Sequence, residues 1–221
     1  MFEKRISIFT GHFGSGKTEV AVNYALKMSK ENKVAIVDLD IVNPFFRTAD
    51  VKEHLEQRGI KVVTPVYANT NVDVPALPAE IYTLFERKDY KVVMDVGGDD
   101  LGARAVSRYR EEIARDDFDM YLVINTRRPF TDTAEKIEEM IQSIEESSRL
   151  KIMKLVNNTN LLNETSCENI TEGYRLIEKV SSKLGIPISF SSGLSEPVTQ
   201  FGKHSLSDVL TLEKLIKLPW D

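Results

Sequence analysis

The sequence predicts an α/β fold: a doubly wound, mostly parallel seven-stranded sheet with helices on both faces. The first observation behind this prediction is a set of seven short apolar, mostly β-branched runs, at residues 5–10, 33–40, 60–67, 90–98, 119–125, 151–157 and 186–192. These runs lack the apolar/polar alternation of half-exposed strands, which indicates burial on both faces. The second observation is that segments with helical spacing lie between the runs. This alternation is typical of parallel sheets with right-handed crossovers, which bind ligands at the carboxyl ends of their strands.

The clearest helix is predicted over residues 132–148. Its apolar residues follow the spacing i, i+3, i+4, i+7 of an amphipathic helix, at Ile137, Met140, Ile141 and Ile144. Asp132 and Glu135 stand where they could form a capping pair in its first turn. Weaker helical patterns cover residues 51–55 and 81–85. Each predicted helix lies between two predicted strands, as the fold requires.

The last residues, 205–221, carry Leu212, Leu215 and Ile216 at helical spacing. A membrane-binding helix needs a basic polar face. Here the lysines of the segment are offset by Asp208, Glu213 and Asp221. We therefore expect a helix docked on the sheet and no membrane partner.

Length, charge and cysteine content limit the function classes. With 221 residues, the chain suits a single domain, 1–221, around one hydrophobic core. Its net charge of −5 makes nucleic acid an unlikely partner. The single Cys167 excludes an internal disulfide and a multi-cysteine zinc site. No signal-peptide pattern or long apolar stretch is present, so we expect a cytoplasmic protein.

The most specific motif is "GHFGSGKT", at residues 11–18, which satisfies G-x-x-x-x-G-K-[ST] between a predicted strand and a predicted helix. Glycines allow the backbone amides of such a loop to turn inward around an anion. Lys17 would reach the β- and γ-phosphates, and Thr18 would ligate Mg²⁺. The expected nucleotide-binding residues here are Gly11, His12, Phe13, Gly14, Ser15, Gly16, Lys17, Thr18 and Glu19.

Acidic residues at the ends of two other strands complete the predicted site. Asp95 ends the run "VVMDVGG", where a carboxylate can hold Mg²⁺ through a water molecule. Asp38 and Asp40 end the run "VAIVDLD". Parallel strands bring their carboxyl ends to one edge, so one of this pair could also point at the phosphates.

These motifs, in this order and spacing, resemble the MinD/ParA/CobQ-type branch of P-loop NTPases (the SIMIBI class), whose members mostly bind ATP. The resemblance covers nearly the whole chain and implies the P-loop NTPase fold. It implies that Lys17 is the phosphate-loop lysine, that Asp38 assists metal binding, that Asp40 positions the attacking water, and that Asp95 is the Walker B carboxylate. It further implies that Asn157 or Asn158, in "VNNTN", reads the adenine edge.

The resemblance also implies that Mg²⁺ and ATP or ADP are the cofactors and that ATP is hydrolysed slowly. It further implies a possible homodimer and a nucleotide switch acting on a protein partner, whose identity the sequence leaves open.

One residue departs from the pattern of dimerising members, which carry a second lysine just after the first glycine of the loop. His12 stands there, and a histidine is only partly charged near neutral pH. Whether His12 replaces that lysine or only fills space stays open.

The base of the nucleotide is predicted from the asparagines that follow the fifth and sixth predicted strands. Guanine recognition of the N-K-x-D type needs an aspartate, which neither residues 125–128 nor residues 157–160 supply. An amide group can both donate and accept hydrogen bonds, which suits adenine, so ATP is preferred over GTP.

Two other functions stay open: a metallochaperone-type GTPase, and an ATP-dependent small-molecule ligase of the dethiobiotin-synthetase-like class. Arg127 and Arg128, after the fifth predicted strand, could bind phosphate or a partner.

Overall fold

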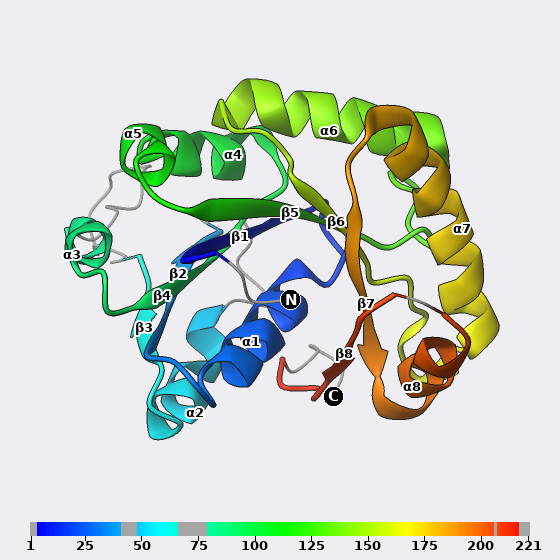
Figure 1. Cartoon of the computed structure of the whole chain (residues 1–221), viewed down its shortest axis with the longest axis horizontal. Helices are drawn as coiled ribbons and strands as arrows, with labels where there is room; N and C mark the ends of the chain where they lie inside the picture. The colour runs from blue at the N-terminus through cyan, green and yellow to red at the C-terminus, as the bar shows by residue number, and fades with distance from the viewer. Residues whose placement is uncertain (1–3, 41–47, 66–78, 206, 217–221) are drawn as a thin grey trace, which may run out of the picture.

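A computed structural model describes residues 4–40, 48–65, 79–205 and 207–216 of the chain, and its centre is one sheet (Figure 1). The strand order is β3-β2-β4-β1-β5-β6-β7-β8, and every pairing is parallel. The strands are β1 (Ile6–Thr10), β2 (Val34–Leu39), β3 (Lys61–Val63), β4 (Lys91–Val96), β5 (Phe118–Ile124), β6 (Lys154–Asn157), β7 (Ile188–Leu194) and β8 (Val209–Leu212). The predicted doubly wound parallel fold is confirmed, with eight strands where seven were predicted.

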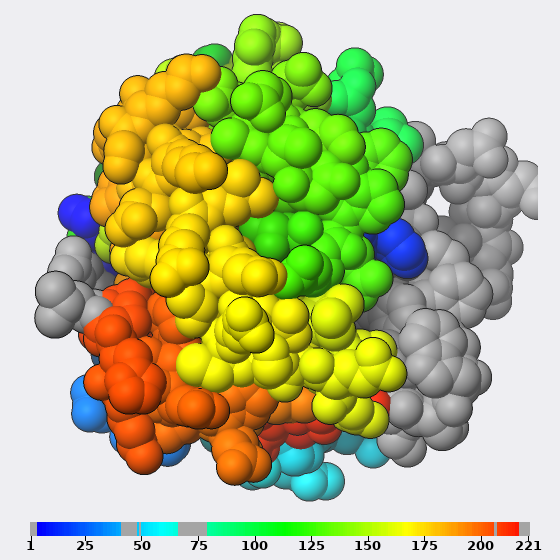
Figure 2. Space-filling view, turned by 90° about the vertical axis from the view of Figure 1, so that its right-hand side faces the viewer, coloured from blue at the N-terminus to red at the C-terminus, as the bar shows by residue number. Residues whose placement is uncertain are grey.

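Helices cover both faces of the sheet (Figure 1). They are α1 (Lys17–Met28), α2 (Lys52–Gln57), α3 (Glu80–Glu86), α4 (Asp100–Ser107), α5 (Arg110–Ala114), α6 (Ala134–Ser148), α7 (Cys167–Leu184) and α8 (Ser195–His204), with short 3-10 turns η1 (Thr48–Val51) and η2 (Leu162–Glu164). Seen from the side of α7, segments of α6, α7 and α8 form one continuous surface (Figure 2). None of the helices in the described ranges is long and apolar enough to cross a membrane.

Each face of the sheet has its own hydrophobic core. In β5, Met120 and Leu122 pack in the core under α3, α4, α6 and α7, whereas Tyr121 and Val123 pack in the core under α1 and α2. Successive side chains of a strand point to opposite faces, so a strand between two cores must be apolar at every position. This requirement explains the uninterrupted apolar runs of the sequence.

The predicted C-terminal helix is wrong where the structure describes it. Residues Val209–Leu212 form the edge strand β8, which pairs with β7. Leu210 and Leu212 are buried while Thr211 is exposed, which is the period of two of a strand. So short an apolar segment does not fix its own period, and pairing with the open edge of β7 decides for a strand. Residue 206 and residues 217–221 of the predicted helix lie outside the described residues.

The predicted helix over residues 132–148 is confirmed as α6, but its cap differs. Thr133 is the N-cap, and its hydroxyl accepts a hydrogen bond from the backbone N–H of Lys136 at 3.3 Å. Asp132 lies one residue outside and pairs with the Lys136 side chain instead. A threonine hydroxyl at this position takes the place that the Asp132–Glu135 pair was predicted to fill.

Candidate phosphate-binding site

The loop between β1 and α1 has the backbone of an anion cradle. Gly14 and Gly16 both have φ of +79°, a left-handed conformation that a residue with a Cβ adopts only with strain. Gly11 packs so tightly that a Cβ there would lie 2.4 Å from the carbonyl oxygen of Val123. Helix α1 begins at Lys17, directly behind the loop, and its N-terminus favours anions. The glycines of the motif therefore stand where close backbone packing and positive φ require them.

Lys17 reaches across from α1 to Asp40, the residue directly after β2. Its ammonium donates a hydrogen bond to Asp40 Oδ2 at 2.5 Å, and both side chains are buried. Burial by itself would lower the pKa of Lys17, but three surrounding carboxylates outweigh that effect and raise it. These carboxylates belong to Asp38, Asp40 and Asp95. The structure thus brings the predicted lysine and the predicted acidic residues together.

The pairing of β2 with β4 explains why the acidic residues meet. In the register of these two strands, Asp38 lies opposite Asp95. The backbone N–H of Asp40 donates to Asp38 Oδ1 at 3.1 Å, which joins Asp40, just after β2, to Asp38 near the end of that strand. Carboxyl ends of adjacent parallel strands therefore form one acidic edge beside the phosphate loop.

Asp95 offers an oxygen atom to the site. Its side chain is fully buried, and its Oδ2 accepts a hydrogen bond from the hydroxyl of Thr48 at 3.2 Å. Its Oδ1 is buried and has no hydrogen-bond partner among the described residues. Burial raises the pKa of Asp95, while the nearby Lys17 and the Thr18 hydroxyl act in the opposite direction. The sequence does not indicate Thr48, because no motif places a hydroxyl ten residues after Asp38.

These residues fit a Mg²⁺ ion that is shared with phosphate. Among the residues described, no group of three or more His, Cys, Asp or Glu side chains could hold a metal ion alone. Mg²⁺ in nucleotide sites takes most of its ligands from phosphate and water and only one or two from carboxylates. The hydroxyl of Thr18 and the unpartnered Oδ1 of Asp95 match that donor set.

The two asparagines at the end of β6 are engaged inside the fold. Asn158 Nδ2 donates to the carbonyl oxygen of Ser15 at 2.7 Å, and its Oδ1 accepts from the hydroxyl of Ser192 at 2.9 Å. Asn157 Nδ2 donates to the carbonyl oxygen of Ile170 and to the hydroxyl of Ser191. Asn158 therefore braces the phosphate loop, and Asn157 ties β6 to its neighbours. Their predicted contact with adenine stays a prediction.

Glu19 points away from the phosphate loop. Its carboxylate accepts hydrogen bonds from the backbone N–H groups of Leu215 and Ile216, at 2.8 and 3.2 Å. One turn further along α1, Asn23 exchanges two hydrogen bonds with the backbone of Glu213. Burial raises the pKa of Glu19. This side chain fastens the C-terminal segment to α1, so only its backbone remains a candidate for nucleotide contact.

The outer rim of the loop is aromatic. The ring of His12 stacks on Phe130, with 4.2 Å between centroids, and Phe13 is 63% exposed. Arg128 Nε donates to the carbonyl oxygen of Gly14 at 3.1 Å. Further exposed apolar side chains follow the carboxyl ends of β4 and β6: Leu101, Leu161 and Leu162. The predicted ligand edge thus carries an apolar rim, which consists of Phe13, Leu101, Phe130, Leu161 and Leu162.

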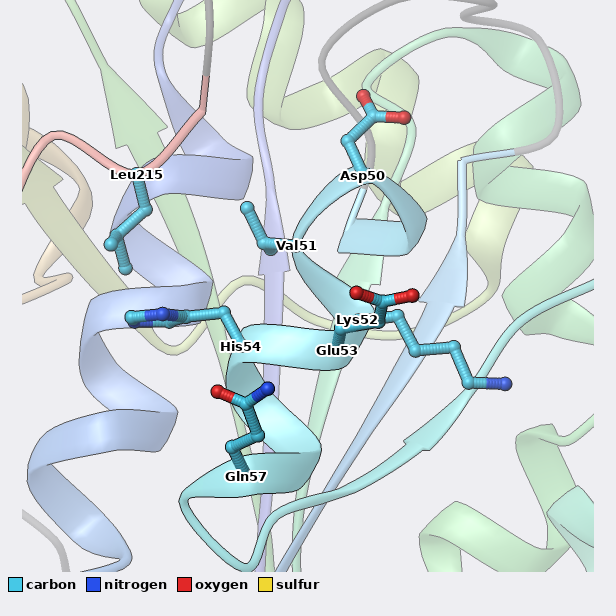
Figure 3. A pocket seen from close by; sticks show the side chains of 7 residues that line it. All are labelled: Asp50, Val51, Lys52, Glu53, His54, Gln57 and Leu215. Carbon is cyan, nitrogen blue, oxygen red and sulfur yellow. The ribbon is translucent and has the colours of Figure 1, made fainter.

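A cavity of about 570 Å³ lies beside η1 and α2 (Figure 3). It contains none of the predicted site residues, and His54 Nε2 is buried there with no hydrogen-bond partner among the described residues. Its lining residues are Asp50, Val51, Lys52, Glu53, His54, Gln57 and Leu215. We therefore place the candidate site at the phosphate loop and not in this cavity.

Comparison with known proteins gives a family match over most of the chain. The family described as the CobQ/CobB/MinD/ParA nucleotide binding domain matches residues 6–196. No curated protein sequence matches the chain.

Solved structures with a similar fold include cell division protein FtsY from Thermotoga maritima, which is 19% identical in sequence and has a TM-score of 0.56. The match covers 87% of this chain and 62% of that chain. Chloroplast FtsY from Physcomitrella patens has 15% identity, coverage of 92% and 65%, and a TM-score of 0.59. FlhF complexed with GTP/Mg²⁺ has 16% identity, coverage of 86% and 66%, and a TM-score of 0.54. The chain spans less than two thirds of the length of each of these structures.

Proposed function

Because this chain belongs to the CobQ/CobB/MinD/ParA nucleotide-binding family, we propose that it binds Mg-ATP, hydrolyses it slowly and acts as a nucleotide switch on a protein partner. The observation that carries the proposal is the glycine cradle in front of α1, with the buried Lys17 facing the acidic ends of β2 and β4. A glycine-rich turn that only joined a strand to a helix would need neither this lysine nor its carboxylate partners.

The proposed mechanism is positioning and charge neutralisation. The amides of the loop and the N-terminus of α1 bind the phosphates. The ammonium group of Lys17, which now donates to Asp40, then also contacts the β- and γ-phosphates. Thr18 and Asp95 would hold Mg²⁺, with Asp38 assisting; when bound, the ion neutralises charge on the phosphate oxygens. Asp40, next to Lys17, orients the attacking water.

ATP is our first choice of nucleotide, since residues 157–160 contain no aspartate to accept hydrogen bonds from guanine. GTP is the second candidate, because the similar FlhF structure is a complex with GTP/Mg²⁺. Asn158 does not decide between them, as its amide is engaged with Ser15 and Ser192. A cytoplasmic location stays a prediction.

A second copy of this chain is the first candidate for the partner. Within the apolar rim, Phe13 belongs to the loop and Phe130 stacks on His12; Phe13 is 63% and Leu101 55% exposed. A partner that covered the rim would bury this apolar surface and would contact the nucleotide directly. Light scattering with a non-hydrolysable ATP analogue and with ADP tests this: Leu101→Glu should weaken a triphosphate-dependent dimer. The matched control is Leu184→Glu, an equally apolar, 40% exposed residue at the end of α7.

Thermal unfolding in the presence of Mg-nucleotides tests the central proposal. A ligand at about 100 times its Kd stabilises the folded state by about 2.7 kcal/mol. We expect Mg-ATP to raise the Tm more than Mg-GTP at equal concentration, and Lys17→Ala to abolish both shifts. A wild-type Tm that no Mg-nucleotide changes would contradict the proposed function. A larger shift with GTP would replace ATP by GTP.

A further inference from the structure

The loop after β5, residues 125–131, is a rigid turn. Asn125 accepts three hydrogen bonds within it: its carbonyl oxygen from the Arg128 N–H at 3.1 Å and from the Thr131 hydroxyl at 2.7 Å, and its Oδ1 from the Arg127 N–H at 3.0 Å. The Thr131 N–H closes the turn on the carbonyl oxygen of Arg128. Asn125 and Thr131 are buried, so this loop has a defined shape at the carboxyl end of β5.

This turn contacts the phosphate loop at two points. Arg128 Nε donates to the carbonyl oxygen of Gly14, and the ring of Phe130 stacks on His12. The Arg128 side chain lies against Gly14: a Cβ at that glycine would be 3.4 Å from Nε and 3.9 Å from Cζ. The guanidinium is therefore fixed at the rim of the anion cradle.

The rest of the Arg128 guanidinium is available for a ligand. In the described part of the chain, its only hydrogen bond through the side chain is the one from Nε. Arg127 differs, because its guanidinium pairs with Glu172 on α7. Neighbouring arginines on the same turn thus have different surroundings: one is neutralised by a carboxylate, and the other faces the phosphate loop.

We propose that Arg128 is a phosphate-binding residue that recognises the terminal phosphate of a nucleoside triphosphate. This inference rests on the proposed function and deepens it. A guanidinium presents parallel N–H donors that match phosphate oxygens, and an Nε already held by Gly14 keeps Nη1 and Nη2 oriented without further ordering. Arg128 thus adds a permanent positive charge to this rim, whereas the charge of Arg127 is paired with Glu172.

The test measures affinity for two nucleotides, of which only one carries a terminal γ-phosphate group. Isothermal titration calorimetry with Mg²⁺ compares ADP with a non-hydrolysable ATP analogue for the wild type, Arg128→Ala, Arg128→Lys and Arg127→Ala. We expect Arg128→Ala to weaken analogue binding about tenfold, which is about 1.4 kcal/mol, with ADP binding changed less than twofold. Arg128→Lys should recover part of the loss, because it keeps the charge without the planar fork. Arg127→Ala should match the wild type.

The outcomes separate this inference from the proposed function. If the wild type binds neither nucleotide, nor their guanine counterparts, the proposed function fails. If it binds both and Arg128→Ala keeps the wild-type ratio of the two affinities, the role of Arg128 is overturned while the proposed function stands. An equal loss for ADP and the analogue counts as the same refutation, because Arg128 would then only brace the loop through Gly14.

Discussion

Lys17 and Asp40, which are 23 positions apart in the sequence, form a buried ion pair with 2.5 Å between Nζ and Oδ2. Asp38 and Asp95 lie close enough to raise the pKa of the same ammonium. One cation among three carboxylates leaves an excess of negative charge at the edge where phosphates are proposed to bind. A divalent cation would balance this charge, which is the electrostatic reason to expect Mg²⁺ dependence.

The ion pair leads to a prediction on stability. Removing one partner of a buried pair leaves an uncompensated charge and costs about 3–5 kcal/mol. Lys17→Ala should therefore lower the free energy of unfolding in urea, and adding Asp40→Asn should restore part of the loss. Equal stabilities of the single and double variants would show that the two residues are not coupled.

Close packing at Gly98 predicts a second effect. A Cβ at this position would lie 2.1 Å from the carbonyl oxygen of Gly11 and 2.8 Å from the backbone nitrogen of His12. Gly98→Ala should displace the start of the phosphate loop, lower stability by about 1–3 kcal/mol and weaken nucleotide binding at least tenfold. Gly59→Ala is the control, since nothing lies within 4 Å of its Cβ position. That variant should lose some stability through its φ of +76° but keep the nucleotide affinity.

The brace between Asn158 and Ser15 can be tested separately. Asn158→Ala removes the donor to the Ser15 carbonyl and the acceptor for the Ser192 hydroxyl. We expect a loss of about 1–3 kcal/mol in unfolding free energy and weaker binding of ADP and ATP alike. Asn163→Ala, at an exposed asparagine five residues later, should change neither quantity. Unchanged nucleotide affinity in Asn158→Ala would mean that the loop keeps its shape without the brace.

Hydrogen exchange can detect the fastening of the C-terminal segment. Glu19→Ala removes the acceptor for the backbone N–H groups of Leu215 and Ile216, so both amides should exchange faster. Nucleotide affinity should fall much less than in Lys17→Ala, because the Glu19 carboxylate points away from the loop. Glu31→Ala, which changes an exposed carboxylate just beyond α1, should leave these amides protected.

Asp116 predicts a pH dependence of stability that is independent of the nucleotide site. Burial by itself would raise the pKa of Asp116, but hydrogen bonds from Arg5 and Lys88 outweigh it and hold the pKa well below its usual range. A lowered folded-state pKa contributes stability above the unfolded-state pKa of about 4, and this contribution is lost as the pH falls toward the folded-state value. Asp116→Asn should therefore be about 2 kcal/mol less stable than wild type at pH 7. The difference should shrink in urea titrations below pH 4; a constant difference from pH 7 to pH 2.5 would contradict the assignment.

The backbone of the loop at residues 11–18 could be predicted, because its glycines lie within one short segment between a strand and a helix. The acidic edge could be predicted in part: Asp38 and Asp95 each end an apolar run, and parallel strands align their carboxyl ends. The prediction of a C-terminal helix, made from Leu212, Leu215 and Ile216, failed because so short an apolar segment does not fix its own period. Pairing with the free edge of β7 made the choice.

What the sequence by itself determined is the layered fold and the place of the glycine loop between β1 and α1. The fold follows from periodicity, and the loop follows from one contiguous motif. Only the tertiary structure decided the partners of individual side chains. It turned Glu19 toward the C-terminal segment and engaged Asn157 and Asn158 inside the fold. It also brought Thr48 to Asp95, and Arg128 to Gly14. The physical reason is that a hydrogen bond needs its donor and acceptor atoms within about 3 Å of each other. For residues far apart in the chain, that distance is set by strand order and loop closure and not by their spacing in the sequence.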